Sequence, residues 1–208
     1  MSERVLWRPA NMLYPCPAVM VTSADREGRP NIMTAAWAGT VCSDPVMVSV
    51  SIRPERYSCG LIRDTHEFVI NLTTRSLVWA ADYCGVKSGR DTDKFKETGL
   101  TPFPCSTVSA PMIKESPVAI ECVVADEIDL GSHIMFLGRV TAVSVREKLI
   151  DEKGRLALEK ADPVAYSHGE YYALGDALGK FGFSVRKKKT DRSGRKTDRK
   201  KRDTQHNE

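Results

Sequence analysis

The chain has 208 residues and a formal net charge of +4, and this length suits one well-buried domain with appendages better than two full domains. No stretch approaches the roughly 20 uninterrupted apolar residues that a membrane-spanning helix needs. Arginines and prolines also interrupt the apolar character of the N-terminus, which therefore does not resemble a secretory signal. From these features we expect a globular, cytoplasmic protein that does not enter a membrane.

The positive charge is concentrated at the C-terminal end. Residues 186–208 contain 11 Lys and Arg against 4 Asp and Glu, so this segment carries +7 and residues 1–185 carry −3. Dense like charge without large apolar side chains predicts disorder. We therefore expect a domain over residues 1–185 and a basic, disordered tail over 186–208. A solvated tail is the favoured interpretation, and weak, salt-sensitive attraction to nucleic acid or another acidic partner is the alternative.

The first third of the chain predicts strands. AVMVTS at residues 18–23 predicts a first strand, and the polar stretch ADREGRP predicts the turn after it. Residues 31–41 and 45–52 predict the second and third strands, with an Asp-Pro turn between them. In the third strand, VMVSVS alternates apolar and small hydroxyl residues at period two, as expected when one side of a strand faces water or a ligand.

Short helices are expected next. One is predicted at residues 57–63, and EFVINL after it predicts a fourth strand. SLVWAADYCG has helical spacing and predicts a helix that ends on Gly85, a natural C-cap. Another short helix is expected in DTDKFKETG, where Asp91 or Thr92 caps the start and Gly99 the end.

Two long runs rich in β-branched residues, 117–131 and 132–147, are separated by Gly131 and Ser132, and they predict an antiparallel pair of strands. No internal repeat is visible. The order of strands and helices is too irregular for a doubly wound parallel sheet. The predicted fold class is therefore mainly β with short helices, in an antiparallel arrangement.

Common cofactor and metal motifs are missing from the sequence. The six cysteines include no C-x-x-C pair, which argues against a zinc site or a thioredoxin-like motif, so no metal ligands are predicted. The glycines of GDALGKFGF do not form the dinucleotide fingerprint, and there is no P-loop. A bound phosphate would therefore have to be held by another segment.

The best candidate for that segment is SIRPERYS, residues 51–58. Arg53 and Arg56 carry two guanidinium forks, and Ser58 places a hydroxyl at the start of the expected helix. Guanidinium groups and helix N-termini both suit a phosphate. The alternative is an edge-of-sheet turn with solvated charges.

Several short motifs in series resemble one family. They are NIMTAAW (31–37), SIRPERYS (51–58), EFVINL (67–72), SGRDTDKF (88–95) and SHIMFLGRV (132–140). Their order and approximate spacing resemble the flavin reductase-like proteins, most closely the flavoredoxins, over about residues 12 to 180. The resemblance implies an FMN-binding split β-barrel of Greek-key strands, which acts as a homodimer with the flavin near the subunit interface.

The resemblance also implies particular flavin-contacting positions. Ser58 matches a phosphate-binding Ser or Thr, whereas Tyr166 stands where a phenylalanine is expected. The positions carried over in this way are Asn31, Trp37, Ser58, Lys94, His133 and Tyr166.

The residue types support these assignments. Arg53, Arg56 and Ser58 offer two positive charges and a hydroxyl donor to a phosphate dianion, with Ser51 at the strand end just before them. The flavin ring needs hydrogen bonds to its pyrimidine edge. Backbone groups of an irregular strand could supply them alongside the Asn31 side chain, and the residues concerned are Met33, Thr34 and Ala35.

Three of the candidate residues have additional or alternative roles. A nearby Lys94 or His133 would favour the reduced, negatively charged flavin. Alternatively, Lys94 is a solvated helix residue, His133 bonds only to backbone beside the hairpin turn, and Trp37 is an aromatic residue of the core or an interface.

The sequence predicts an FMN-dependent oxidoreductase that passes electrons from a reductant such as NAD(P)H to a flavin, iron or protein acceptor. The flavin itself accepts the hydride or electrons, so no side chain is assigned as a catalytic acid, base or nucleophile. The alternative functions are an electron carrier serving protein partners and, with less support, a nucleic-acid-associated protein that acts through its basic tail.

Overall fold

The computed structural model describes residues 3–185. Residues up to Leu174 form one compact unit, and a second unit begins at Gly175, where the described part includes a short 3-10 helix, Phe183–Val185. The predicted boundary after residue 185 and the predicted disorder of 186–208 fall at and beyond the last described residue, so both stay predictions. No helix in the described part has the length and apolar character needed to span a bilayer.

Antiparallel strands dominate the compact unit. Within residues 3–185, one sheet of seven strands has the order β3-β2-β6-β9-β10-β5-β4. Its strands are β2 (Val19–Ala24), β3 (Pro30–Ala35), β4 (Ala38–Ser43), β5 (Val46–Ile52), β6 (Glu67–Leu72), β9 (Val118–Asp129) and β10 (Ile134–Val145). Smaller antiparallel pairings join β1 (Cys16–Pro17) to β11 (Val164–Ser167), β11 to β12 (Glu170–Ala173), and β7 (Pro102–Phe103) to β8 (Met112–Ile113). The predicted mainly β, antiparallel class is confirmed.

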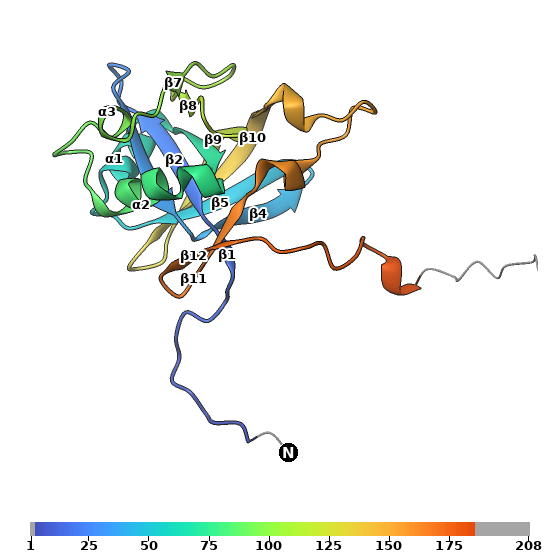
Figure 1. Ribbon diagram of the computed structural model, residues 1–208. Helices are drawn as coiled ribbons and strands as arrows, with labels where there is room; N and C mark the ends of the chain where they lie inside the picture. Colours follow the sequence, from blue (N-terminus) through green and yellow to red (C-terminus); the bar gives the residue numbers. More distant parts are fainter. Residues whose placement is uncertain (1–2, 186–208) are drawn as a thin grey trace, which may run out of the picture. The chain divides into compact units, whose positions relative to one another are not determined.

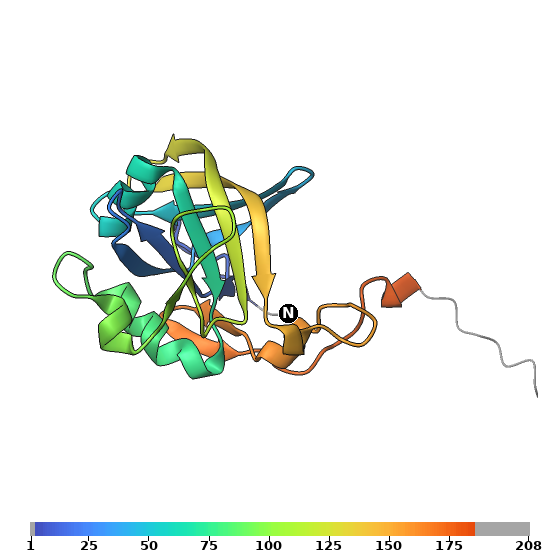
Figure 2. The same cartoon turned by 90° about the horizontal axis from the view of Figure 1, so that it is seen from above.

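The two edge strands of the main sheet, β3 and β4, are consecutive in the chain and are separated only by Ala36 and Trp37. From Ala35 to Ala38 the chain can span at most roughly 11 Å. The sheet must therefore curl until its edges meet, which makes it a barrel (Figures 1 and 2). The prediction of one continuous strand over residues 31–41 is wrong, because the bend at Trp37 carries no local glycine or proline signal.

The barrel interior is apolar. Its core includes Val21, Val50, Phe68 and Phe136, each with an accessibility of 0%. In β5 the buried residues alternate with half-buried ones, as the period-two pattern predicted. Strand β2 buries every side chain, because α2 (Val78–Val86) covers its outer face together with that of β3 (Figure 1). This second apolar layer fixes α2 against the strand that leads into the bend.

Helix α1 (Tyr57–Thr65) starts where the sequence predicted and ends at His66, which takes the left-handed conformation with φ 57°. Helix α2 follows a 3-10 turn, Arg75–Leu77, and continues past Gly85, so the predicted C-cap at Gly85 is wrong. A Cβ at Gly85 would lie 3.3 Å from the Thr34 Cβ. This glycine therefore serves close packing of α2 on β3 and not a turn.

Helix α3 (Lys94–Thr98) is capped by Asp93, which accepts a hydrogen bond from the Lys96 N–H at 3.2 Å. The predicted caps Asp91 and Thr92 are wrong. The predicted end at Gly99 is confirmed, because Gly99 takes φ 68° at the C-cap. Two further 3-10 turns, Glu147–Leu149 and Leu158–Ala161, lie between β10 and β11.

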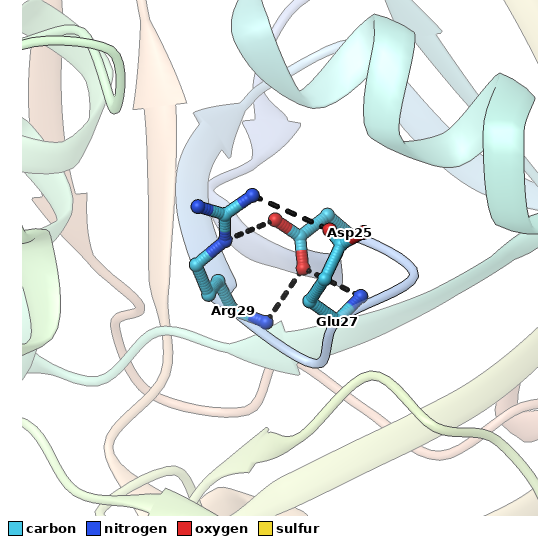
Figure 3. Close-up of polar contacts among 3 residues, drawn as sticks. All are labelled: Asp25, Glu27 and Arg29. Carbon is cyan, nitrogen blue, oxygen red and sulfur yellow. Dashed lines mark hydrogen bonds and ion pairs between the residues drawn. The ribbon is translucent and has the colours of Figure 1, made fainter.

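The predicted turn between β2 and β3 is confirmed, and its geometry depends on one carboxylate (Figure 3). Asp25 accepts hydrogen bonds from the Glu27 N–H at 3.1 Å and from the Arg29 N–H at 2.8 Å. Burial raises the pKa of Asp25, but the hydrogen bonds and charge of Arg29 outweigh burial and leave the pKa below its usual value. The turn thereby fixes the register that sets Asn31 opposite Ser23.

Candidate functional site

Two cavities lie side by side within residues 3–185 and share Met33, Arg53 and Arg56 in their walls. The split cavity, of about 300 Å³, lies at the bend between β3 and β4. The helix cavity, of about 350 Å³, lies at the start of α1. Besides the three shared residues, the split cavity holds the sequence-predicted residues Thr34, Ala35, Trp37, Ser51, His133 and Tyr166, and the helix cavity holds Asn31, Ser58 and Lys94. The structure thus brings all twelve predicted site residues to one or other of two adjoining cavities.

The N-terminus of α1 opens into the helix cavity without a side-chain cap. Arg56 occupies the N-cap position and makes no capping hydrogen bond, and the first turn contains no acidic residue. The free N–H groups of a helix N-terminus carry a partial positive charge and attract anions. This end of the helix is therefore available to a ligand.

Ser58 lies at the base of the helix cavity, with an accessibility of 1%. Its Oγ accepts a hydrogen bond from Asn31 Nδ2 at 2.8 Å, and no residue of the described part 3–185 accepts the Ser58 hydroxyl hydrogen. A buried hydroxyl with an unused donor calls for an acceptor. The cavity is lined by four cationic side chains and one carboxylate, namely Arg53, Arg56, Lys87, Lys94 and Glu55, so that acceptor is best supplied by an anion.

Lys94 is buried, with an accessibility of 4%. Its Nζ donates hydrogen bonds to the carbonyl oxygens of Ile32 at 2.7 Å and Cys84 at 2.8 Å. The alternative of a solvated lysine is therefore wrong. Burial lowers the pKa of Lys94 to about 8; the Cys84 thiol opposes this shift and Arg56 adds to it. An ammonium has three donors, so one N–H remains for a ligand in the helix cavity.

The segment that joins α2 to α3 forms one wall of the helix cavity. Lys87, Ser88 and Gly89 line it, although the sequence reasoning did not assign them. A Cβ at Gly89 would lie 1.9 Å from Asn31 Oδ1, so any larger residue there would have to displace the buried Asn31 side chain. Ser88 and Gly89 could have been predicted as site residues, since both belong to the motif SGRDTDKF, which also contains the predicted Lys94.

The split cavity is built around the bend. The Ser51 N–H donates to the Trp37 carbonyl at 2.8 Å, which ties β5 to the bend. The rings of Trp37 and His133 meet edge to face with centroids 5.4 Å apart, and Trp37 keeps 44% of its surface exposed. Thr34 donates its hydroxyl to the Ala81 carbonyl and so anchors β3 to α2. The result is an open slot with a backbone floor and an aromatic edge.

Tyr166 on β11 and Tyr171 on β12 also line the split cavity, and their rings meet with centroids 5.6 Å apart. The Tyr171 hydroxyl donates to Asp82 Oδ1 at 3.4 Å. Burial, together with the Asp82 carboxylate, raises the pKa of Tyr171 to about 12, so its phenol stays protonated. The sequence reasoning missed Tyr171 because it predicted no strands after residue 147. It missed Asp82 because nothing in the α2 segment indicates that a tyrosine 89 positions later would meet it.

His133 and Lys94 were expected to lie together against one ring, but they line different cavities. His133 lies beside the β9–β10 turn, where its Nδ1 is 2.9 Å from the Ser132 hydroxyl. The two lysines, Lys87 and Lys94, line only the helix cavity, whereas Arg53 and Arg56 stand between the two cavities. Most of the aromatic groups line the split cavity. The pair of cavities suits a ligand with an anionic end and a planar end.

Comparison with known proteins agrees with this geometry. The family model for the flavin reductase like domain matches residues 12–175. Flavoredoxin of Desulfovibrio vulgaris (Miyazaki F) is 38% identical with a TM-score of 0.82, and the match covers 89% of this chain and 100% of that chain. Flavoredoxin from Methanosarcina acetivorans is 26% identical with a TM-score of 0.80, covering 88% and 100% of the two chains.

An FMN-binding protein from Thermus thermophilus is also similar, at 26% identity and a TM-score of 0.72, with 86% of this chain and 99% of that chain covered. These matches confirm the split β-barrel predicted from the motifs. They extend over the same part of the chain as the predicted resemblance, from the N-terminal strands to the β11–β12 hairpin. The chain belongs to the flavin reductase-like family.

Proposed function

We propose that this protein is an FMN-dependent oxidoreductase whose helix cavity holds the FMN phosphate and whose split cavity holds the flavin ring. The observation that carries the proposal is the uncapped N-terminus of α1, flanked by Arg53 and Arg56, with the unused Ser58 donor at its base. Helix N-termini, guanidinium forks and hydroxyls together form a phosphate-binding donor set. Similar structures described as flavoredoxin and as an FMN-binding protein support the choice of FMN.

The residues of the split cavity fit the planar end of such a ligand. Backbone groups of Met33, Thr34 and Ala35 run along the cavity wall. Trp37 and Tyr166 offer aromatic surface, which packs well against a flat ring. In this proposal His133 donates to the ring or stabilises charge on it, and Ser51 holds the bend in place.

When bound, FMN supplies a site that accepts a hydride or electrons and passes them on. The chain itself binds the phosphate, orients the ring and limits access of water to it. We propose NAD(P)H as the electron donor and a free flavin, a ferric complex or a redox protein as the acceptor. The phenol of Tyr171 stays protonated and donates its one hydrogen to Asp82, so its oxygen is left to accept a hydrogen bond from a second ligand in the split cavity.

The visible spectrum of the purified protein under anaerobic conditions tests the function. We expect a yellow holoprotein that bleaches within seconds to minutes after NADH or NADPH is added, since a bound oxidised flavin accepts the hydride. Bleaching by a protein donor alone would favour the electron-carrier alternative. A colourless protein that does not bind added FMN would contradict the proposal altogether.

We also propose a homodimer, as the resemblance to the family implies. Trp37 at the split cavity is 44% exposed, and Val41 and Val46 on β4 and β5 are 52% and 50% exposed. Exposed apolar groups at a ligand site and on the strands that lead from it suit a subunit contact. Light scattering at micromolar concentration is expected to give twice the chain mass, and a monomeric mass with FMN still bound would contradict the proposal. A cytoplasmic location and any role of residues 186–208 with nucleic acid stay predictions.

A further inference from the structure

The segment between α2 and α3, residues 87–93, crosses the wall of the helix cavity, and we call it the strap. Both ends of the strap are fixed. Helix α2 packs closely on β3 at Gly85, and α3 begins with the buried Lys94. Ser88 and Gly89, in the middle of the strap, face the cavity. The position of the middle therefore decides how open the cavity is.

Arg90 holds the middle of the strap against the start of α1. Its NH1 donates to the Glu55 carbonyl at 2.9 Å, and its guanidinium lies over the Tyr57 ring, 5.4 Å from the centroid. The strap also bonds to itself, because the Arg90 N–H donates to Ser88 Oγ at 3.2 Å. Within residues 3–185, the Arg90 side chain makes the hydrogen bond and the cation–π contact that join the strap to the SIRPERYS segment.

Arg90 does not line either cavity and is itself exposed. Its two contacts hold the strap beside the start of α1. The preceding residue, Gly89, lies so close to Asn31 that a Cβ there would be 1.9 Å from Asn31 Oδ1, and Asn31 in turn donates to Ser58. Arg90 thus acts on a ligand in the helix cavity through the wall residues that it holds together, Ser88 and Gly89 of the strap and Glu55 and Tyr57 opposite.

We propose that Arg90 is a positioning residue that keeps the strap closed over the helix cavity and thereby sets how slowly the phosphate end of the cofactor leaves. The inference rests on the proposed function, since it needs a phosphate in that cavity. A closed strap makes FMN a long-lived prosthetic group, and an open strap makes it an exchanging substrate. Arg90 would then determine which of these two modes the protein uses.

The test measures FMN dissociation from the holoprotein, by stopped-flow dilution followed by the recovery of free-flavin fluorescence. Arg90→Ala is expected to accelerate FMN release about tenfold, because it removes one hydrogen bond and one cation–π contact. Riboflavin, which has no phosphate, is expected to leave the variant and the parent at the same rate. Lys96→Ala is the matched control, because it removes one positive charge from an exposed position on α3 that lines neither cavity.

Arg90→Lys distinguishes the loss of the strap's contacts from the loss of a positive charge. A lysine ammonium carries its charge and donors at one point, so it cannot bond to the Glu55 carbonyl and also lie flat over the Tyr57 ring. This variant is therefore expected to release FMN faster than the parent. Release at the parent rate from Arg90→Lys would overturn the inference in favour of a simple charge effect. An unchanged rate in Arg90→Ala, or equal acceleration of riboflavin, would also overturn it. If the parent itself does not bind FMN, the proposed function has failed, and that result is distinct from all of these.

Discussion

Replacing Arg53 or Arg56 by alanine is expected to weaken FMN binding ten- to a hundredfold and to weaken riboflavin binding much less. Both side chains border the helix cavity beside the uncapped start of α1. The loss of a charge-assisted contact to a phosphate costs on the order of 1.5–3 kcal/mol, and each 1.4 kcal/mol is about a tenfold change in affinity. Riboflavin lacks the phosphate, so it keeps only what these arginines contribute to the wall of the split cavity. Fluorescence titration of both ligands with the apoprotein measures the difference.

Arg63→Ala provides the matched control for this experiment. Arg63 lies in the last turn of the same helix, pairs with Glu127 at 3.0 Å and lines neither cavity. Its removal is expected to leave both affinities unchanged. If the Arg53 and Arg56 variants lost affinity for FMN and for riboflavin equally, the assignment of the phosphate to the helix cavity would be wrong.

The affinity for FMN is expected to fall as the pH rises above about 8, by up to about tenfold per pH unit. The cause is Lys94, whose pKa is lowered to about 8 by burial. A phosphate dianion beside it favours the charged ammonium and raises that pKa, so binding is coupled to the retention of a proton. Above the pKa of the free protein, the neutral Lys94 amine must take up a proton from solution when FMN binds, and the affinity drops. The second ionisation of a phosphate lies near pH 6, well below this window.

Lys94→Met is expected to flatten this pH dependence, whereas Lys96→Met, on the exposed side of the same helix, is expected to retain it. Titrations of FMN and riboflavin between pH 7 and 9.5 measure both slopes. A slope that persists in Lys94→Met would show that another group titrates. The affinity for riboflavin is expected to be independent of pH over this range in all three proteins.

The lowered pKa of Lys94 also makes the stability of the apoprotein depend on pH. The folded pKa lies below the ordinary value of 10.5, so the folded state holds fewer protons than the unfolded chain between about pH 8 and 10.5. The contribution of Lys94 to stability is therefore fully present above that window and is lost as the pH falls through about 8.

Local patterns in the sequence were enough to predict much of the fold. The period-two stretch VMVSVS predicted β5 with its alternating burial, and the two long runs around Gly131 and Ser132 predicted the β9–β10 pair. Gly99 was identified as a C-cap from its neighbours. Each of these features depends on residues close together in the chain, where backbone propensity and side-chain spacing decide the outcome.

The motifs also identified the site residues, but only by resemblance. Composition and spacing could not show that Asn31 and Ser58 share a hydrogen bond across 27 positions, or that Lys94 reaches the Ile32 and Cys84 carbonyls. For that reason the sequence also allowed Lys94 to be a solvated helix residue. Its burial arises because α2, α3 and β3 pack into one apolar layer.

The antiparallel β class, the cationic turn at the start of α1 and, through the motifs, the family all follow from the amino-acid sequence alone. The bend at Trp37, the packing role of Gly85 and the contact of Asp82 with Tyr171 depend on the folded barrel. They arise from the closure of the sheet. When β3 and β4 become the two edges of one curled sheet, residues far apart in the chain become neighbours. Their contacts outweigh the local conformational preference of each segment.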